Sequence, residues 1–462
     1  MSKTRMESDS IGTMAVPEQV YYGVQTLRAK ENFDITGYRM HPAFINSMAW
    51  IKKAAAITNQ SAGTLDAKTA SAIIQACDEI IGGDLHEEFI VDPIQGGAGT
   101  SANMNMNEVL ANRANEILGH SKGDYGNVHP NDHVNMAQST NDVIPTAGKL
   151  TVLTLLQPLL SELNRLIETL SEKTIEFDDV IKMGRTQLQD AVPMRLGQTF
   201  HGYASMVTRD RKRIQDMSKE MYTVNLGGTA IGSAINTSDL YVHDIVPCLA
   251  KLTNYPLRQA EDLFDATENL DGFVAISSAI KTCAVDLSKM CNDLRLLSSG
   301  PKTGLKEINL PPKQNGSSIM PGKVNPVIPE VVTQVAFHIV GHDTTITMAA
   351  EAGQMELNAF EPVVFFNLFE SITTLTQAVK TLTDNCVSGI TANREHCLEL
   401  LEGSAGIATA LCPYIGYKKS AEIAKYALKT GKTVKELVLE EHLLSEGDLS
   451  RILNPYAMTM GI

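Results

Sequence analysis

The chain has 462 residues, of which 43% are apolar and 20% are charged, and its formal net charge is −14. This length predicts two or three structural regions and a large core, and the composition is that of an ordinary globular protein. The acidic balance argues against nucleic acid and anionic membranes as partners, so a bound anion must find positive charge within its own site.

The cysteines and the N-terminal residues indicate the compartment. The seven cysteines are scattered, odd in number and without a Cys-x-x-Cys pair, which favours a reduced chain. The first ten residues, MSKTRMESDS, lack the apolar core of a signal peptide, and no uninterrupted apolar run is long enough to span a membrane. We therefore expect a cytoplasmic protein that does not bind a membrane.

The predicted elements, taken in chain order, begin with weak strand patterns that are confined mostly to the first 40 residues. The stretch TASAIIQACDEIIGG then predicts a helix that stops at Gly82 and Gly83. Its apolar face comprises Ile73, Ile74, Cys77, Ile80 and Ile81.

Two longer apolar stripes and two further apolar stretches predict long helices. The first stripe contains Pro158, which predicts a kink or a new helix start. The residues of the first stripe are Leu156, Leu160, Leu163, Ile167 and Leu170, and those of the second are Ile276, Ile280, Cys283, Leu287, Met290, Leu294 and Leu297. The stretches 331–352 and 365–386 are similar in character. Helices of about 30 residues are ~45 Å long, which suits a bundle of parallel or antiparallel rods.

We therefore predict a mainly α fold with a long central helical bundle and smaller N- and C-terminal regions. A mixed but mostly helical region is expected over 1–140, the long-helix bundle over 141–395 and a small helical region over 396–462.

Four polar stretches interrupt this helical pattern: QGGAGTSANMNMNE (95–108), HVNMAQSTNDVIPT (133–146), GRTQLQDAVP (184–193) and GSSIMPGKVNP (316–326). They are rich in hydroxyl, amide and glycine N–H groups, which donate hydrogen bonds to oxygen anions. Each could by itself be a helix cap or a turn. Four of them in one helical chain favour a site that binds an anion.

Other chemistries fit the sequence poorly. The GGAGTS segment lacks the Gly-Lys-Ser/Thr ending of a phosphate loop, and neither His-Glu-x-x-His nor Gly-x-Ser-x-Gly occurs. His129 and His133 are four residues apart, but Pro130 and Asn131 between them argue against a helix and hence against a metal-binding pair. We predict no metal site.

The stretch GSSIMPGKVNP resembles the signature loop of the fumarase/aspartase superfamily. The likeness covers essentially the whole chain and includes YYGVQTLRAKENF (21–33), the other three polar stretches, NLGGTAIGSAIN (225–236) and CNDLRLLSSGP (291–301). It implies a homotetramer in which each site draws on three subunits. It implies no organic cofactor, because the chemistry needs only acid, base and charge stabilisation.

Within the superfamily, four details favour members that reversibly remove ammonia from L-aspartate to give fumarate. The second stretch reads Ser-Thr-Asn, where members that hydrate fumarate usually have Ser-Ser-Asn. Gln187 replaces the histidine that the hydratases carry, and the segments NPVIPEVV and MAAEAGQMELNAFEP also fit the ammonia-lyases. The alternatives are a fumarate hydratase and, of another class, a non-enzymatic protein such as the lens crystallins built on this scaffold.

The resemblance also implies roles for individual residues. Ser317 is the general base, and the hydroxyls around the β-carboxylate belong to Thr100, Ser139, Thr140 and Ser318. Such donors would stabilise the dianionic aci-carboxylate that forms when the carbon next to the carboxylate loses its proton.

The rest of the implied site holds the other end of the substrate. Lys323 and Asn325 anchor the second carboxylate with help from Thr186, and Asn141 is the first candidate to contact the ammonium group beside Gln187. Arg28 is either an additional cationic contact or a residue without a role in the site, solvated or in a structural ion pair.

Overall fold

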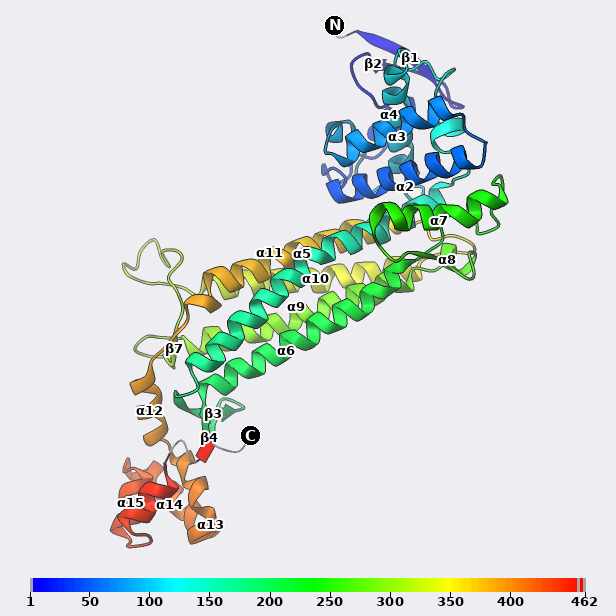
Figure 1. Ribbon diagram of the computed structural model, residues 1–462. Coiled ribbons are helices and arrows are strands. Elements are labelled where there is room, and N and C mark those ends of the chain that lie inside the picture. Colours follow the sequence, from blue (N-terminus) through cyan, green and yellow to red (C-terminus); the bar gives the residue numbers. More distant parts are fainter. Residues whose placement is uncertain (1–2, 455–457, 460–462) are drawn as a thin grey trace. The chain divides into compact units, whose positions relative to one another are not determined.

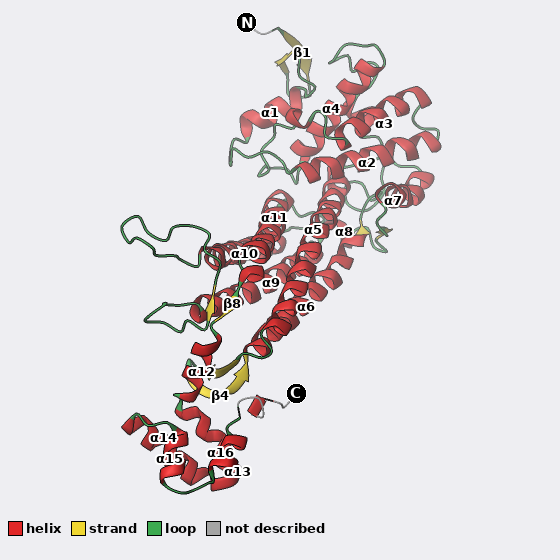
Figure 2. Cartoon of the chain, turned by 60° about the vertical axis from the view of Figure 1, so that its left-hand side comes forward, coloured by secondary structure: helices red, strands yellow, loops and turns green. Residues whose placement is uncertain are grey.

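The computed structural model describes residues 3–454 and 458–459, most of which are helical (Figures 1 and 2). The chain forms two compact units. Unit 1 comprises Met1–Leu160, Lys212–Thr282 and Phe337–Leu375, and unit 2 comprises Ser161–Arg211, Cys283–Ala336 and Thr376–Ile462. The three predicted regions follow the sequence order, whereas each unit is assembled from three separate segments, so the predicted boundaries stay a prediction.

Five long helices supply segments to both units and confirm the predicted bundle (Figure 1). They are α5 (Thr140–Glu176), α6 (Leu196–Met217), α9 (Asp271–Leu297), α10 (Val327–Glu351) and α11 (Glu361–Asn385). All seven residues of the predicted stripe on α9 are buried, because their spacing keeps them on one side of the helix.

The first predicted stripe lies on α5, where the sequence predicts either a kink or a new helix start at Pro158. The helix continues from Thr140 to Glu176 without the new start expected at Pro158. Pro158 and Thr154, whose carbonyl loses its intrahelical partner, are both exposed, so water can satisfy that carbonyl. By length and composition α5 could cross a membrane, contrary to the sequence expectation, but 67% of its most apolar window is buried.

Unit 1 holds the N-terminal strands and a group of shorter helices. These are β1 (Thr4–Ser8), β2 (Thr13–Pro17), α1 (Val24–Asn32), α2 (Pro42–Ser61), α3 (Ala67–Ile81), α4 (Thr100–Ile117), β5 (Thr223–Val224), α7 (Asp239–Thr253), β6 (Arg258–Gln259) and α8 (Asp265–Glu268). Strands β1 and β2 pair antiparallel, whereas β5 and β6 pair parallel. The predicted helix at 69–83 is confirmed as α3, which ends at Ile81 with Gly82 as its C-cap.

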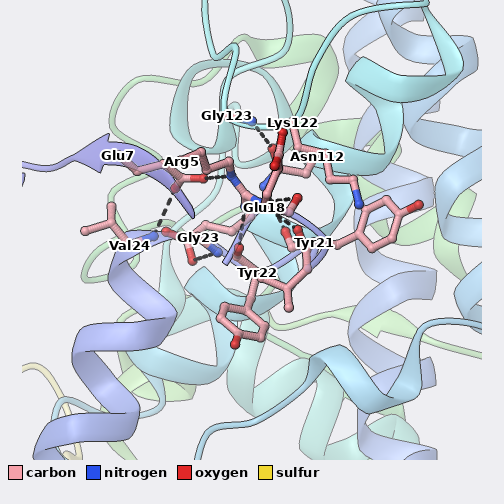
Figure 3. Close-up of polar contacts among 12 residues, drawn as sticks. Arg5, Glu7, Glu18, Tyr21, Tyr22, Gly23, Val24, Asn112, Lys122 and Gly123 are labelled. Carbon is pink, nitrogen blue, oxygen red and sulfur yellow. Dashed lines mark hydrogen bonds and ion pairs between the residues drawn. The ribbon is translucent and has the colours of Figure 1, made fainter. Parts of the chain in front are cut away.

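A hydrogen-bonded centre ties β1 to the segment that leads into α1 (Figure 3). Arg5 donates to the carbonyl groups of Val20 and Tyr22 at 2.8 Å and forms an ion pair with Glu7 at 2.6 Å. Glu7 in turn accepts a hydrogen bond from the N–H group of Val24 at 3.0 Å. These charge-assisted contacts hold the N-terminal segment that carries the YYGVQT sequence.

Unit 2 contains a β-hairpin and the C-terminal helices. Its own elements are β3 (Ile181–Thr186), β4 (Gln189–Arg195), β7 (Ile308–Asn309), β8 (Thr391–Ala392), α12 (Arg394–Glu402), α13 (Cys412–Ile415), α14 (Tyr417–Thr430), α15 (Val434–Glu440) and α16 (Glu446–Ile452). Both strand pairs are antiparallel. The β3–β4 hairpin corrects the expectation that strands lie mostly in the first 40 residues.

The close approach of α5 and α11 in unit 1 gives a test of packing. A Cβ atom at Gly148 on α5 would overlap the ring of Phe365, which is 3% exposed. We expect Gly148→Ala to lower the free energy of unfolding by about 1–3 kcal/mol, because the tightly packed ring has to move. Urea or thermal unfolding measures the change.

The matched control is Gly202→Ala on α6, where an added Cβ meets no atom within 4 Å. This variant should be as stable as the wild type or more stable by about 0.5–1 kcal/mol, because alanine favours the helix. Equal or greater stability of Gly148→Ala would contradict the packing shown here.

Candidate functional site

The first polar stretch forms the turn that starts α4 in unit 1. Gly97, Ala98 and Gly99 all have positive φ values, of 85°, 54° and 88°, and they reverse the chain directly before Thr100. Thr100 is exposed, and its hydroxyl donates to the carbonyl oxygen of Gly97 at 2.6 Å. A Cβ atom at Gly99 would lie 2.9 Å from the side chain of Ile144, so this turn needs glycine for both conformation and space.

The second polar stretch lies beside the first. Ser139 precedes α5, and its hydroxyl accepts a hydrogen bond from the N–H group of Asn141 at 3.2 Å. Thr140 is the first residue of α5, and its hydroxyl oxygen is 3.2 Å from the amide nitrogen of Asn103 on α4. The structure therefore brings two of the four predicted stretches together within unit 1.

Asn141 is held by a third segment, the 225–236 stretch of the superfamily resemblance. Its side-chain amide donates to the carbonyl oxygen of Ala230 at 2.7 Å, and its own carbonyl accepts from the side chain of Asn225 at 3.0 Å. This arrangement commits the NH₂ group of Asn141 to the protein and leaves its side-chain oxygen as the acceptor for a ligand.

A buried lysine beneath the second stretch was missed by the sequence analysis. Lys52 on α2 is fully buried, and its ammonium group donates to the side-chain oxygens of Asn135 and Gln138, at 2.9 Å each. Asn103 and Asn107 also donate to the Asn135 oxygen, both at 3.2 Å. The sequence signal was a pair of lysines, Lys52 and Lys53, within the otherwise apolar stretch MAWIKKAAAI, which is typical of a helix exposed on one side.

A buried carboxylate lies at the start of α5. Asp142 accepts hydrogen bonds from the N–H groups of Ser139 at 2.9 Å, Gly227 at 3.1 Å and Thr229 at 3.0 Å. Burial raises the pKa of Asp142 to about 6, although these three donors oppose the shift. Burial also lowers the pKa of Lys52 to about 7, and the negative charge of Asp142 opposes that shift.

The third polar stretch is the tip of the β3–β4 hairpin in unit 2. Thr186 pairs with Gln189, and the two residues between them, Gln187 and Leu188, have φ values of 53° and 62°. Positive φ at both central residues is the geometry of a tight hairpin turn whose usual residues are Asn-Gly. Thr186 and Gln187 are both exposed at this tip.

Buried ion pairs hold the base of the hairpin. Glu307 is fully buried, and its two carboxylate oxygens lie 2.7 Å from Arg185 and 3.1 Å from Lys182. Farther along the hairpin, Ser404 donates its hydroxyl to Asp190 at 2.6 Å. The hairpin tip therefore projects from a base that charged side chains fix in place.

The fourth polar stretch forms a loop with a closed neck in unit 2. Asn315 and Val324 form an isolated antiparallel bridge, and the N–H group of Gly316 donates to the carbonyl of Lys323 at 2.7 Å. The side chain of Asn325 donates to the carbonyl of Gly316 at 2.8 Å. Asn325 therefore shapes the neck of the loop, in addition to the anchoring role that the resemblance implies.

Ser317 lies directly after this neck. Its hydroxyl oxygen accepts hydrogen bonds from the N–H groups of Ile319 at 3.2 Å and Met320 at 3.0 Å. Two converging donors lower the cost of negative charge on that oxygen. Ser318 and Lys323 are exposed on the same loop. Among the described residues, Lys323 forms no ion pair, so its charge is available to a ligand.

Two remaining predictions concern Arg28 and the histidine pair. Arg28 forms a two-pronged contact with the carboxylate of Asp9, with distances of 3.0 and 3.1 Å, as the structural alternative predicted. The expectation that no helix forms between His129 and His133 is wrong, because residues 130–134 form a π-helical turn that tolerates Pro130 at its first position.

The predicted site residues thus belong to two groups. Ser139, Thr140 and Asn141 lie together at the start of α5, and Thr100 is the first residue of α4, whose Asn103 contacts Thr140 within unit 1. Thr186 and Gln187 lie on the hairpin, and Ser317, Ser318, Lys323 and Asn325 lie on the loop, within unit 2. Each group exposes hydroxyl or amide groups that suit an oxygen anion, and the loop adds one cationic side chain.

Comparisons with known proteins agree over nearly the full length. Residues 12–341 match the family described as Lyase, and residues 407–460 match the family described as Fumarase C C-terminus. The chain is 51% identical to an aspartate ammonia-lyase from Bacillus sp over 98% of this chain and 97% of that protein. It is 52% identical to one from Pseudomonas aeruginosa, over 99% and 97%.

Solved structures show the same similarity. A fumarate lyase:delta crystallin from Brucella melitensis bound to cobalt is 48% identical, with a TM-score of 0.97 over 99% of this chain and 100% of that chain. A class II fumarase from Schistosoma mansoni is 37% identical, with a TM-score of 0.95 over 99% of each chain.

The buried lysine gives a prediction on pH. Folded Lys52 releases its proton near pH 7, whereas in the unfolded chain it keeps the proton up to about pH 10.5. Between these values the unfolded state binds more protons, so the wild type gains stability with rising pH and loses it as the pH falls towards 7. The Lys52→Met variant has no ionisable group at this position, so its stability lacks this contribution to the pH dependence.

We therefore expect the free energy of unfolding of the wild type to increase relative to that of Lys52→Met across this pH window. Urea unfolding of both proteins at a series of pH values measures the difference. Parallel curves would show that Lys52 keeps an ordinary affinity for its proton in the folded protein.

Proposed function

This chain belongs to the lyase family, as a member of the fumarase/aspartase superfamily, and from that premise we propose that it reversibly eliminates ammonia from L-aspartate to give fumarate. The observation that carries the proposal is the identity of about half of all residues to aspartate ammonia-lyases over nearly the whole chain. As a member of this family the chain is a carbon–nitrogen lyase. We also propose that it works in the cytoplasm, as its scattered cysteines suggest.

The difficult step in this reaction is removal of a proton from the carbon next to the β-carboxylate. The electron pair left behind moves onto that carboxylate and gives a dianionic aci-carboxylate, which then expels the amine and forms the carbon–carbon double bond. Donors that are preorganised around the developing charge supply the largest stabilisation. In our proposal these are the hydroxyls of Thr100, Ser139, Thr140 and Ser318.

We propose that Ser317 is the base that takes this proton. A serine hydroxyl is a weak base until it is ionised. The N–H groups of Ile319 and Met320 already point at its oxygen, and they support the ionised form together with the charge of Lys323 on the same loop. Closure of the loop over the substrate would exclude water from the reacting atoms.

The other end of the substrate carries a carboxylate and an ammonium group. Lys323 is the cation for the α-carboxylate, assisted by Asn325 and Thr186. The ammonium group needs a hydrogen-bond acceptor. Asn141 suits that need, because its NH₂ group is committed to Ala230 and its side-chain oxygen is left to accept.

We further propose that the protein is a homotetramer with sites shared between subunits. The proposed donors are divided between unit 1 and unit 2, and α10 exposes an apolar stripe that suits burial against another copy. Within unit 1 this stripe contains Phe337, Val340 and Met348, which are 68%, 39% and 67% exposed.

A paired assay tests the reaction. Ultraviolet absorbance follows fumarate formation from L-aspartate and from L-malate under identical conditions. We expect the rate with L-aspartate to be at least about 100-fold higher, because a site built for an ammonium group rejects a neutral hydroxyl. Comparable rates, or a faster reaction with L-malate, would reassign the protein as a fumarate hydratase, and no reaction with either would favour a structural protein.

A second prediction concerns the proposed base. Ser317→Ala should lower kcat by about 10²–10⁴-fold, the usual contribution of acid–base catalysis, while the melting temperature stays within a few degrees of the wild type. The side chain lies in a polar loop, so its loss leaves no core cavity. The control is Ser388→Ala, which changes an exposed serine of unit 2 outside the loop. A Ser317→Ala variant with a substantial share of wild-type kcat would remove this residue as the base.

A third prediction concerns the shared sites. Asn141→Ala and Ser317→Ala, each inactive alone, are unfolded and refolded together in equal amounts. If a site takes its unit 1 and unit 2 residues from different subunits, roughly one quarter of the sites in random tetramers have both intact. Activity should then reappear, and separately refolded parents are the control. A mixture as inactive as its parents would place each site within one chain.

A further inference from the structure

Three side chains with metal-binding atoms meet between α10 and α11 within unit 1. His338 and His342 are one turn apart on α10, so both project from the same side of that helix. Glu370 on α11 faces them, with a carboxylate oxygen 3.5 Å from Nε2 of His338. Each residue offers a donor atom, and these three atoms lie within 4.8 Å of one another.

The spacing is close to that of a tetrahedral transition-metal site. Such an ion binds imidazole nitrogen and carboxylate oxygen at about 2.0–2.2 Å, which places the donors about 3.4 Å apart. The His338–Glu370 distance already has this value. His338 is half exposed, so its side chain has room to rotate towards the other donors.

A hydrogen-bonded chain sets the imidazole of His342 in the form that binds metals. The hydroxyl of Ser371 donates to the carbonyl oxygen of Asn367 at 2.7 Å, so its oxygen must act as the acceptor towards His342. Nδ1 of His342, 3.0 Å away, therefore carries the proton and donates to Ser371. Nε2 is left with a free lone pair, as in histidine ligands whose other nitrogen is held by a second hydrogen bond.

Burial and access also fit a bound ion. His342 is only 9% exposed, and its ring centre lies 4.0 Å from that of His338, so both imidazoles are close enough to bind one ion. Glu370 also lines a cavity of about 720 Å³ in unit 1, through which water and an ion can reach the carboxylate.

We propose that His338, His342 and Glu370 bind one divalent transition-metal ion, such as Zn²⁺ or Co²⁺, with water completing its coordination. Two imidazoles and one carboxylate favour these ions over Mg²⁺ and Ca²⁺, which prefer six or more oxygen ligands. The ion links α10 to α11 and stabilises the folded chain by binding to it selectively. This site is independent of the proposed elimination reaction.

The test uses the full-length protein, free of affinity tags and stripped of metal, titrated with Co²⁺. Calorimetry gives the stoichiometry and Kd, and the visible absorption of Co²⁺ reports nitrogen ligands and low coordination number. We expect one ion per chain and a higher melting temperature with the ion bound. Failure of the wild type to bind Co²⁺ saturably at this stoichiometry would overturn the proposal.

Variants assign the ligands. His338→Ala, His342→Ala and Glu370→Gln should each weaken Co²⁺ binding more than about tenfold and change its spectrum. His338→Ala removes a half-exposed side chain, so it tests the site even if His342→Ala fails to fold. The matched control is His201→Ala, an exposed histidine on helix α6, which should bind Co²⁺ as the wild type does.

The hydrogen bond that His342 donates to Ser371 can be tested separately. Ser371→Ala should weaken Co²⁺ binding by about 10–100-fold, and Ser371→Thr, which keeps the hydroxyl, should restore it. If the His338 and Glu370 variants bind Co²⁺ with the wild-type affinity and spectrum, the ion lies elsewhere and the proposal is wrong.

Discussion

The candidate site in unit 1 depends on one buried carboxylate. Asp142 is removed from water at the start of α5, and an ionised group in that position is tolerated only if the protein replaces its hydration. The replacement comes from three backbone N–H groups, one from Ser139 and two from the 227–229 turn. Since Asp142 and Gly227 are 85 residues apart in the sequence, satisfying one carboxylate fixes the position of both segments.

Lys52 completes this arrangement from the other side. Its ammonium group lies under the second polar stretch and is bound by two side-chain amides, which orient the loop that presents Ser139 and Thr140. A buried cation and a buried anion thus support neutral hydroxyl donors that reach the surface. Neutral donors in fixed positions suit a substrate with two carboxylates, because they stabilise a growing negative charge without a mobile counter-charge.

We propose that the loop at 316–326 in unit 2 closes over the substrate. A loop that closes over a substrate must be mobile as a whole but fixed at its ends. Its neck is held by the bridge between Asn315 and Val324 and by the Asn325 side chain, while Pro321 and Gly322 lie in its exposed part. Gly316 cannot be replaced at the neck, because a Cβ atom there would lie 2.6 Å from the carbonyl oxygen of Lys323. The Ser317 hydroxyl is held by N–H groups of the same loop, so these hydrogen bonds persist when the loop moves as a whole.

The sequence by itself determined the long helices, and its resemblance to a known superfamily nominated the residues of the candidate site. The stripe on α9 was predictable because a helix has a fixed period, and the helix end at Gly82 because glycine favours termination. The hairpin was not predictable, because its turn residues, Gln187 and Leu188, are not those that usually adopt positive φ. The hairpin is held by the ion pairs of Arg185 and Lys182 with Glu307. These pairs join residues more than 100 positions apart in the sequence.

Only the tertiary structure decided which polar side chains are buried and which groups they meet. The sequence around Lys52 is typical of a helix that is exposed on one side. The burial of Lys52 follows from the packing of α2 against the second polar stretch. His338 and His342 show their spacing in the sequence, but Glu370 comes from another helix. The physical reason is the same in both cases: period and composition are local properties of the chain, whereas desolvation and the choice of partner arise when distant segments pack together.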